Sequence, residues 1–455
     1  MTSLLIRDAA YILTMDEDRR ELVDTSIEVH DGWITNIGSE TGAKEFDMVI
    51  DGSEMLVLPG FVNVHHHLYQ NLTRGFPESE GRTLFPWLRM LYPVWSGLDE
   101  ECIHVSTQVG LAELLLTGCT TSSDHLYVFP KGERHFIDVE VAAATEIGAR
   151  FHATRGSMDL SVESGGLPPA SVTQECDEIL DDSERVVRQY NDPEPGALTR
   201  VAVAPCSPFS VTRRLMEESA TLARRLGVRL HTHIAETLDE ERYCEEAFGC
   251  PPIELLERMG WLGDDVWLAH CVHLADDDIQ RLSSTRTAVA HCPTSNMLLG
   301  SGMARIVDLL RAEVAVGLGV DGSASNDSGY FPGEIKQSLL MARTRDGVDA
   351  MTARQALWLA TRGGAAALGR DDIGHLCRGA CADISMFRLD RIQYTGAERD
   401  PAGAFVLCGP ARASHVFVHG RQVVRDGQLT SLQEDDLARR HRQASSRLLR
   451  RAGLS

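Results

Sequence analysis

Two histidines separated by one residue follow a short apolar run near the start of the chain, in the sequence LPGFVNVHHHLYQ. On an extended backbone, side chains two residues apart point to the same side, so His65 and His67 can reach one metal ion while His66 points away. The alternative is a pair of core histidines whose nitrogens are satisfied by hydrogen bonds. The spacing by itself indicates a metal site without excluding a structural role.

Three further polar residues that could serve as metal ligands or as acid–base groups lie downstream, each where an apolar run stops. They are His233 in HTHIAE, His270 in LAHCVH and Asp321 in GVDGSASND. Together with the H-x-H pair they offer nitrogen and oxygen ligands that suit Zn²⁺, with Fe²⁺ as the competing ion. Such a metal lowers the pKa of a bound water towards about 7. Glu236, three residues after His233, is placed to move protons at the same rim.

The elements that must position these residues alternate between short apolar strands and amphipathic helices over about residues 59–370. This alternation is typical of parallel strands connected by helices. The clearest strands are expected at 201–205, 228–236, 266–273, 287–293 and 314–321. In a (β/α)₈ barrel the carboxyl ends of the strands face the active site, which is where these polar residues fall. An open doubly wound sheet is the alternative, although no Walker-type phosphate loop follows a strand.

Both ends of the chain carry a different pattern, in which short alternating strands are separated by Gly-containing turns. The N-terminal runs LLIRDAAYIL, SIEVHDGWITNIG and DMVIDGSEMLVLPG predict antiparallel hairpins. Similar runs return in ADISMFRLD and HVFVHGRQVVRDGQL, so we expect the two ends to build one small β-sandwich domain. The chain is thus predicted to be an α/β protein. Its expected parts are residues 1–58 and 373–432 for the β-sandwich, 59–372 for a distorted (β/α)₈ TIM barrel and 433–455 for a C-terminal helix.

Charge and cysteine usage narrow the class of protein. The 455 residues include 44 basic and 66 acidic side chains, a net charge of −22 that disfavours binding to nucleic acid or to an anionic membrane. Eleven cysteines without C-x-x-C pairs are typical of reduced thiols and predict a cytoplasmic location. There is no secretory signal pattern and no apolar run of about 18 or more residues. The expected partner is a small molecule.

The order of these motifs resembles the amidohydrolase superfamily, and within it the aminohydrolase branch that includes adenosine, guanine and cytosine deaminases and triazine hydrolases. The segments that carry the resemblance are PGFVNVHHH, HTHIAE, LAHCVH, HCPTSN and VDGSASND. The metal ligands that the resemblance implies are His65, His67, His233 and Asp321. The implied catalytic residues are Glu236, His270 and Asp321. Family members are commonly homo-oligomers, so a homo-oligomer is the expected state.

The scarcity of lysine bears on the number of metal ions. Two-metal members of the superfamily bridge their ions with a carboxylated lysine after the fourth barrel strand. The three lysines of the chain, Lys44, Lys131 and Lys336, do not occupy such a place. One metal ion per chain is therefore expected, and dihydroorotase-like, phosphotriesterase-like and urease-like activities are disfavoured.

Further segments narrow the resemblance to deaminases of oxidised purines and pterins. HHHLYQNLTR, LFPWLRMLYPVW, HATRGSMDLSVESGGLPP and APCSPFSVT are similar to bacterial 8-oxoguanine and isoxanthopterin deaminases. The implied reaction converts 8-oxoguanine and water to urate and ammonia, and the presence of Asp321 favours deamination over dechlorination. Isoxanthopterin, guanine or cytosine deaminase and triazine amidohydrolase stay open as alternatives. A non-catalytic scaffold with the same fold is the alternative from another class.

A planar heterocyclic amine needs aromatic faces and hydrogen bonds along its edge. The four candidate residues are Gln70 for an amide edge, Trp87 and Tyr92 for ring contacts, and Arg155 for a carbonyl. Each of them also has a structural interpretation, since aromatic residues are common in protein cores. The residues left without an assigned role are His125, His291 and Cys206.

Overall fold

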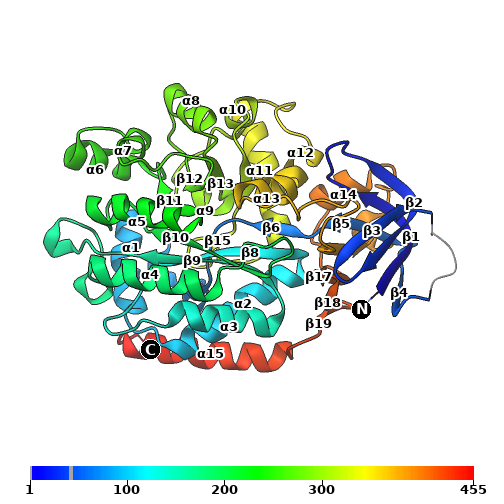
Figure 1. The fold of residues 1–455 in the computed structure, drawn as a ribbon, viewed down its shortest axis with the longest axis horizontal. Helices are drawn as coiled ribbons and strands as arrows, with labels where there is room; N and C mark the ends of the chain where they lie inside the picture. Colours follow the sequence, from blue (N-terminus) through cyan, green and yellow to red (C-terminus); the bar gives the residue numbers. More distant parts are fainter. Residues whose placement is uncertain (1–2, 40–44, 455) are drawn as a thin grey trace.

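In the computed structural model, the chain forms a closed barrel with a separate sheet beside it (Figure 1). The structure describes residues 3–39 and 45–454. The barrel is built from the middle of the chain, whereas the sheet is built from both ends (Figure 1). The predicted fold class, a (β/α)₈ barrel with a β-domain from the two chain ends, is confirmed.

Within the described residues the barrel consists of eight parallel strands in the order β10-β11-β12-β13-β14-β6-β8-β9. Their bounds are β6 Phe61–Asn63, β8 Cys119–Leu126, β9 Arg150–Ser157, β10 Thr199–Pro205, β11 Leu230–Ile234, β12 Val266–His270, β13 Ala288–His291 and β14 Val316–Leu318. Apart from the first two residues of β10, every one of these residues is buried. Parallel strands covered on both faces are mostly apolar along their whole length, which explains the continuous apolar runs in the sequence.

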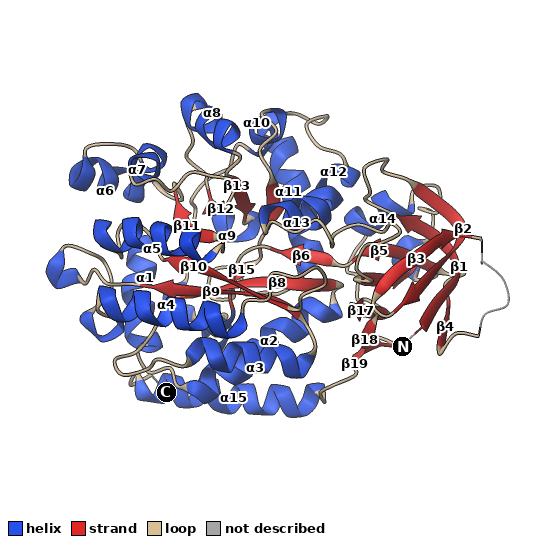
Figure 2. Cartoon of the chain, in the orientation of Figure 1, coloured by secondary structure: helices blue, strands red, loops and turns tan. Residues whose placement is uncertain are grey.

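Helices cover the outside of the barrel (Figure 2). The bounds of the helices are α1 Leu84–Trp95, α2 Glu100–Leu116, α3 Phe136–Ile147, α4 Cys176–Tyr190, α5 Arg213–Leu226, α6 Leu238–Phe248, α7 Pro252–Arg258, α8 Asp276–Thr285, α9 Pro293–Leu298, α10 Ile306–Arg311, α11 Phe331–Asp346, α12 Ala353–Trp358, α13 Gly364–Ala367, α14 Pro401–Leu407 and α15 Glu434–Arg451. None of these helices, within the described residues, is both long and apolar enough to cross a membrane.

Helix α5 illustrates why these segments are helical. Its buried face includes Leu215, Met216 and Ala220, at helical spacing. The Thr212 hydroxyl caps the N-terminus by accepting a hydrogen bond of 3.2 Å from the Leu215 amide. Gly227 ends the helix with a φ of 68°, a left-handed conformation that glycine adopts at little cost. Capping and a one-sided apolar face therefore define both ends and the orientation of the helix.

The sheet from the two chain ends has nine strands in the described part of the chain. Its strands are β1 Ser3–Leu13, β2 Glu21–His30, β3 Trp33–Gly38, β4 Met48–Asp51, β5 Met55–Pro59, β16 Ile384–Arg388, β17 His415–Val418, β18 Arg421–Arg425 and β19 Gln428–Leu429. β1, β2 and β3 form the predicted antiparallel hairpins, and β5 pairs antiparallel with β16. The pairing of β5 with β16 joins the two ends of the chain into one sheet.

The pairing of β4 and β5 with β1 differs from the antiparallel expectation, because both pairs are parallel. The Gly52 amide donates to the Arg7 carbonyl at 2.7 Å, and the Ala10 amide donates to the Gly52 carbonyl at 2.9 Å. The chain between β4 and β5 therefore stays bonded to β1 and does not reverse direction. The Asp-Gly pair at this point does not form the hairpin turn that the sequence suggested.

Helix α15 lies along α2 on the outside of the barrel, at the bottom of the view in Figure 1. It also contacts η1, the short 3₁₀ helix Leu68–Thr73 that directly follows the H-x-H pair. Ser445 Oγ donates to the Leu72 carbonyl at 2.6 Å, and His441 Nε2 lies 2.7 Å from Asn71 Oδ1. The C-terminal helix thus supports the segment that carries the two predicted metal-binding histidines.

Candidate metal centre and active site

A two-stranded parallel pair follows β6 and β14 at the carboxyl end of the barrel. It consists of β7, His66–His67, and β15, Asp321–Gly322, with Asp321 opposite His66. This pairing brings together residues that are distant in the sequence. Asp321 Oδ1 lies 3.2 Å from His65 Nε2 and 3.3 Å from His67 Nε2, and all three side chains are buried.

The fourth predicted ligand, His233, reaches the same point from β11. Its Nε2 lies 3.1 Å from Nε2 of His67. The Nδ1 atoms of both rings are engaged with backbone carbonyls, so the two Nε2 atoms present lone pairs to each other. A cation between them would stabilise this arrangement. Three imidazoles and one carboxylate also make a donor set that fits a zinc-type metal ion.

Backbone carbonyls fix the tautomers of His67 and His233. Nδ1 of His67 donates to the carbonyl of His125 at 2.7 Å, and Nδ1 of His233 donates to the carbonyl of Cys206 at 2.7 Å. Metal-binding histidines commonly hold their second nitrogen in this way, which orients the ring and raises its basicity. Both Nε2 atoms are therefore left free to bind a metal.

His231 orients the ring of His65 in the same way, by accepting a hydrogen bond from Nδ1 of His65. Its Nδ1 donates to the Trp267 carbonyl at 2.8 Å, so its Nε2 accepts from Nδ1 of His65 at 2.8 Å. Its ring also stacks on that of Trp267, with the ring centroids 4.5 Å apart. His231 is not among the residues predicted from the sequence to belong to the site. The H-T-H spacing of His231 and His233 is the same signal as the H-x-H pair, and it places both rings on the interior side of β11.

The carboxylate of Asp321 is held by three donors. Ser295 Oγ and Ser325 Oγ donate to Oδ2 at 2.6 and 3.3 Å, and the Gly322 amide lies 2.7 Å from Oδ1. Burial alone would raise the pKa of Asp321, but the adjacent rings of His65, His270 and His67 hold it well below its usual range. Asp321 is therefore a carboxylate at neutral pH. No sequence signal distinguished the two serines.

Glu236 and His270 lie beside this group of ligands. His270 Nε2 is 3.6 Å from Glu236 Oε2 and 4.0 Å from Asp321 Oδ2, while its Nδ1 lies 3.0 Å from Asn296 Oδ1. Burial raises the pKa of Glu236 to about 7, although His270 opposes the shift. A carboxyl with a pKa near neutrality can both give and take a proton. Asn296 orients the ring of His270.

Glu240 holds the turn on which Glu236 sits. Its two carboxylate oxygens accept hydrogen bonds from the Ala235 and Glu236 amides, at 3.1 and 2.8 Å. Ala235 has a φ of 51°, so this turn needs support from the surrounding structure. The T-x-x-E spacing of Thr237 and Glu240 is a capping-box signal that could have indicated this role.

A small cavity of about 30 Å³ lies between these groups. Its lining includes five of the predicted ligand and catalytic residues, namely His67, His233, Glu236, His270 and Asp321. Three predicted substrate-binding residues also line it, namely Gln70, Trp87 and Tyr92. Apolar side chains complete the wall, among them Leu84, Leu88, Phe209 and Leu299. A cavity of this size holds one or two waters, so a bicyclic substrate requires these side chains to move apart.

The polar atoms of the three substrate-binding candidates differ in their partners. Trp87 Nε1 donates to the Ala324 carbonyl at 3.2 Å. The Tyr92 hydroxyl and Gln70 Oε1 are buried without a hydrogen-bond partner, and so are free to meet a polar ligand. Gly322 leaves room for Gln70, because a Cβ at that position would lie 1.8 Å from Gln70 Oε1.

Arg155 does not line the cavity. Its guanidinium forms a 2.6 Å ion pair with Asp182 on α4, donates to Gln174 at 2.9 Å and lies over the ring of Phe129. The side chain therefore points from β9 into the layer between the strands and the helices. In this arrangement Arg155 is engaged with Asp182 and does not reach the cavity, so its contact with a substrate carbonyl stays a prediction.

Two of the residues without an assigned role also have clear positions. Cys206 lines the cavity, and its carbonyl orients His233. Burial raises the pKa of its thiol to about 12, so it is not a thiolate nucleophile at neutral pH. His291 is buried at the end of β13 and is not among the lining residues.

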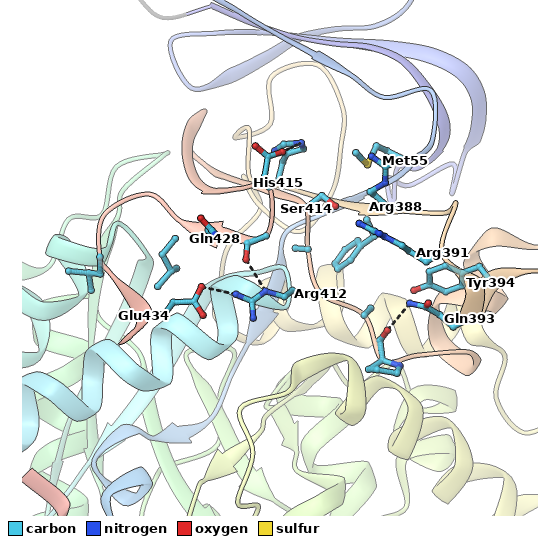
Figure 3. A pocket seen from close by; sticks show the side chains of 18 of the residues that line it. Met55, Arg388, Arg391, Gln393, Tyr394, Arg412, Ser414, His415, Gln428 and Glu434 are labelled. Carbon is cyan, nitrogen blue, oxygen red and sulfur yellow. Dashed lines mark hydrogen bonds and ion pairs between the residues drawn. The ribbon is translucent and has the colours of Figure 1, made fainter. Parts of the chain in front are cut away.

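A larger and more open pocket of about 890 Å³ lies between the sheet and the start of α15 (Figure 3). Its lining contains none of the predicted site residues. Arg412 pairs with Glu434 at 2.7 Å, and Arg388 pairs with Asp390 and Glu54. These cations already have partners within the chain. The smaller cavity, where acid–base groups and metal ligands converge, is the candidate active site.

A pair of buried carboxyls supports the turn after His67 and makes stability depend on pH. Asp124 on β8 accepts a 2.6 Å hydrogen bond from the Leu68 amide, and its buried carboxyl interacts electrostatically with that of Glu140 on α3. Burial raises the pKa of both carboxyls, and the neighbouring Asp124 raises that of Glu140 further. The folded state therefore binds protons more tightly than the unfolded state does.

Raising the pH above about 4, where unfolded carboxyls ionise, should accordingly lower the free energy of unfolding through this pair. Glu140→Gln keeps an N–H donor for Asp124 but cannot titrate. We expect its free energy of unfolding, measured by urea titration at several pH values, to fall less steeply with rising pH than that of the wild type. The exposed Glu245→Gln is the control. Parallel pH profiles for Glu140→Gln and the wild type would show that this carboxyl pair does not make the free energy of unfolding depend on pH.

The fold and this site define a class of protein, a (β/α)₈ barrel with residues that could hold a metal ion gathered at the carboxyl ends of the strands. Residues 56–423 match the model of the amidohydrolase family. The chain belongs to the amidohydrolase family, and the prediction of a hydrolase of this type is confirmed.

Named relatives cover nearly the whole chain. The 8-oxoguanine deaminase of Pseudomonas aeruginosa is 46% identical over 423 residues, which are 92% of this chain and 94% of the relative. The hydroxydechloroatrazine ethylaminohydrolase of Pseudomonas sp. strain ADP is 36% identical, with 96% and 94% covered. The crystal structure of atrazine chlorohydrolase from Arthrobacter aurescens TC1 complexed with zinc superposes with a TM-score of 0.94 at 33% identity, covering 97% of this chain and 100% of that one.

Proposed function

We propose that this protein is a metal-dependent hydrolytic deaminase that converts 8-oxoguanine and water to urate and ammonia. The observation that carries the proposal is the convergence of three imidazoles, a carboxylate and the Glu236–His270 pair on one cavity. The 46% identity to an 8-oxoguanine deaminase supports the choice of substrate. The unpartnered Gln70 and Tyr92 oxygens suit a planar ring with polar groups along its edge.

The residues that would hold the metal are His65, His67, His233 and Asp321. We propose Zn²⁺, one ion per chain, because the donor set suits zinc and a related structure is complexed with it. Bound there, the metal supplies Lewis acidity and lowers the pKa of water. Fe²⁺ is the competing ion for the same ligands.

Asp321 and Glu236 carry out different proton transfers, Asp321 as the base and Glu236 as the acid. Asp321 is ionised, and its Oδ2 is oriented by Ser295, so it takes a proton from the water that attacks the ring carbon bearing the amine. Glu236, with its pKa raised by burial, gives a proton to the neighbouring ring nitrogen. Asp321 then gives the proton that it took from water to the exocyclic amine, the C–N bond breaks and ammonia leaves. The hydroxyl proton returns to Glu236 as a new carbonyl forms on the attacked carbon.

His270 and the apolar wall complete the site. With Nδ1 facing Asn296 Oδ1, His270 directs Nε2 towards Glu236 and Asp321, where it stabilises the oxyanion that develops on the attacked carbon. The wall of Leu84, Leu88 and Phe209 excludes bulk water from the reacting atoms. The water that reacts is thus the one that the site positions.

Ammonia release from purified protein of known metal content tests the substrate. At matched concentrations of 8-oxoguanine, isoxanthopterin, guanine, cytosine, adenosine and a triazine, we expect the highest kcat/KM for 8-oxoguanine, with about one metal ion per chain. The physical reason is that a site with fixed polar contacts discriminates strongly against analogues that leave those contacts unpaired.

Preference for another amine of the panel would keep the hydrolytic site and refute the assignment of 8-oxoguanine. The triazine is included because of the 36% identity to a hydroxydechloroatrazine ethylaminohydrolase, and for it the release of ethylamine is measured beside that of ammonia. Metal-loaded protein that releases no ammonia from any of the six compounds would refute deamination of this substrate class. Protein that binds no metal would refute the proposed metal centre.

A further inference from the structure

His125, near the end of β8, contacts two of the proposed metal ligands at once. Its backbone carbonyl accepts the 2.7 Å hydrogen bond from Nδ1 of His67. Its ring stacks on the ring of His233, with the centroids 4.6 Å apart and the planes 16° from parallel. The side chain is 0% exposed. A single residue of β8 therefore fixes the orientation of ligands that come from β7 and β11.

The two ring nitrogens of His125 have different surroundings. Nε2 donates to the carbonyl of Ala204 at 2.9 Å, so the neutral ring keeps its lone pair on Nδ1. Nδ1 is buried and has no hydrogen-bond partner. One ligand-type atom each from His65, His125 and His233 lie within 4.8 Å of one another. A buried acceptor without a donor is unfavourable unless positive charge lies nearby.

We infer that His125 is a positioning residue of the metal centre and raises the affinity of that centre for its metal. The stacked ring holds His233, the carbonyl holds His67, and the lone pair on Nδ1 lies where a neighbouring cation offsets its lack of a donor. The inference rests on the proposed metal site but not on the identity of the substrate. His125 would thus support His67 and His233, as His231 supports His65, without being one of the proposed metal ligands.

His152 provides a matched control in the same barrel. It is a buried histidine on the adjacent strand β9, and its ring lies 5.4 Å from that of Trp267. Among the described residues it has no hydrogen bond or ring contact with a proposed ligand. His152→Phe therefore disturbs the barrel interior as His125→Phe does, without touching the metal centre.

The test measures metal affinity rather than turnover. The metal-free proteins are titrated with Zn²⁺ in competition with a chromophoric chelator, and thermal unfolding of the metal-free forms checks folding. His125→Phe keeps a flat ring on His233 but loses the Nδ1 lone pair and the bond to Ala204. His125→Asn keeps a polar group near the Nδ1 position but loses the stacked ring. We expect both to bind Zn²⁺ about 10–100-fold more weakly than the wild type, and His152→Phe to match the wild type.

A folded His125→Phe with wild-type Zn²⁺ affinity would overturn the inference. So would an equal loss of affinity in His152→Phe, since any disturbance of the barrel interior would then suffice. If His125→Phe does not fold, His125→Asn decides: folded protein with wild-type affinity overturns the inference, and a 10–100-fold loss supports it. Wild-type protein that binds no Zn²⁺ would instead refute the proposed metal centre, and the two failures are therefore distinguishable.

Discussion

Glu236→Gln should lower kcat by about 10²–10⁴-fold, the contribution typical of a general acid or base. Glutamine has nearly the same shape as glutamate, so the amides that Glu240 holds and the nearby ring of His270 should stay in place. What disappears is the proton that Glu236 gives to the substrate ring. KM should change much less than kcat, because the lost interaction belongs to the transition state.

Metal content separates this prediction from a general loss of structure. Glu236 is not one of the proposed ligands, so the variant should retain as much metal as the wild type. The exposed Glu246→Gln, on the neighbouring helix α6, is the control for the substitution itself and should keep full activity. Wild-type kcat in Glu236→Gln would refute its role in proton transfer. Loss of metal together with activity would mean that Glu236 acts on the centre instead.

Asp321→Asn should have a larger effect, because Asp321 is placed to serve both as a ligand and as a base. The amide removes the negative charge that faces His65 and His67 while keeping the size of the side chain. We expect metal affinity to fall by more than the about 10–100-fold typical of residues that only support a ligand. With saturating metal restored, kcat should still fall by about 10²–10⁴-fold, since no base remains to take the proton from water.

The measurements are Zn²⁺ titration of the metal-free variant and ammonia release at rising Zn²⁺ concentration. The exposed Asp349→Asn should match the wild type in both. Full recovery of activity at high Zn²⁺ would show that Asp321 acts as a ligand alone. Undiminished affinity and activity would remove it from the site.

The grouping of the candidate ligands could be predicted because each ligand is marked by a pattern in its own short segment of the sequence. His233, His270 and Asp321 each follow an apolar run, and the carboxyl ends of barrel strands meet at one face. The strand itself is shorter than predicted around His233, as β11 covers Leu230–Ile234 within the expected 228–236. Ends of this kind are set by hydrogen bonds to neighbouring strands, which the local sequence does not contain.

The direction in which the Arg155 side chain points could not be predicted from the sequence. β9 is buried along its entire length, so no alternation of polar and apolar residues indicates which side chains face the barrel interior. A charged residue in such a strand looks like a site residue until its partner is known. Here the partner, Asp182, lies on α4, and the pairing depends on how that helix packs. Ser295 and Asn296 could not be assigned from the sequence for the same reason, because their contacts run from helix α9 to Asp321 and His270 on distant strands.

The sheet built from the two chain ends can form completely only after the whole barrel has been synthesised. β5 lies between β1 and β16, and its residues from Met55 to Pro59 pair with Arg388 to Ile384. During synthesis β5 leaves the ribosome before any barrel strand, whereas β16 follows all of them. Until β16 is synthesised, one edge of β5 therefore lacks its hydrogen-bond partner. An unpaired strand edge can pair with strands of other chains and so promote aggregation. The exposed edge of β5 is thus covered only when the C-terminal strands of the sheet have been synthesised.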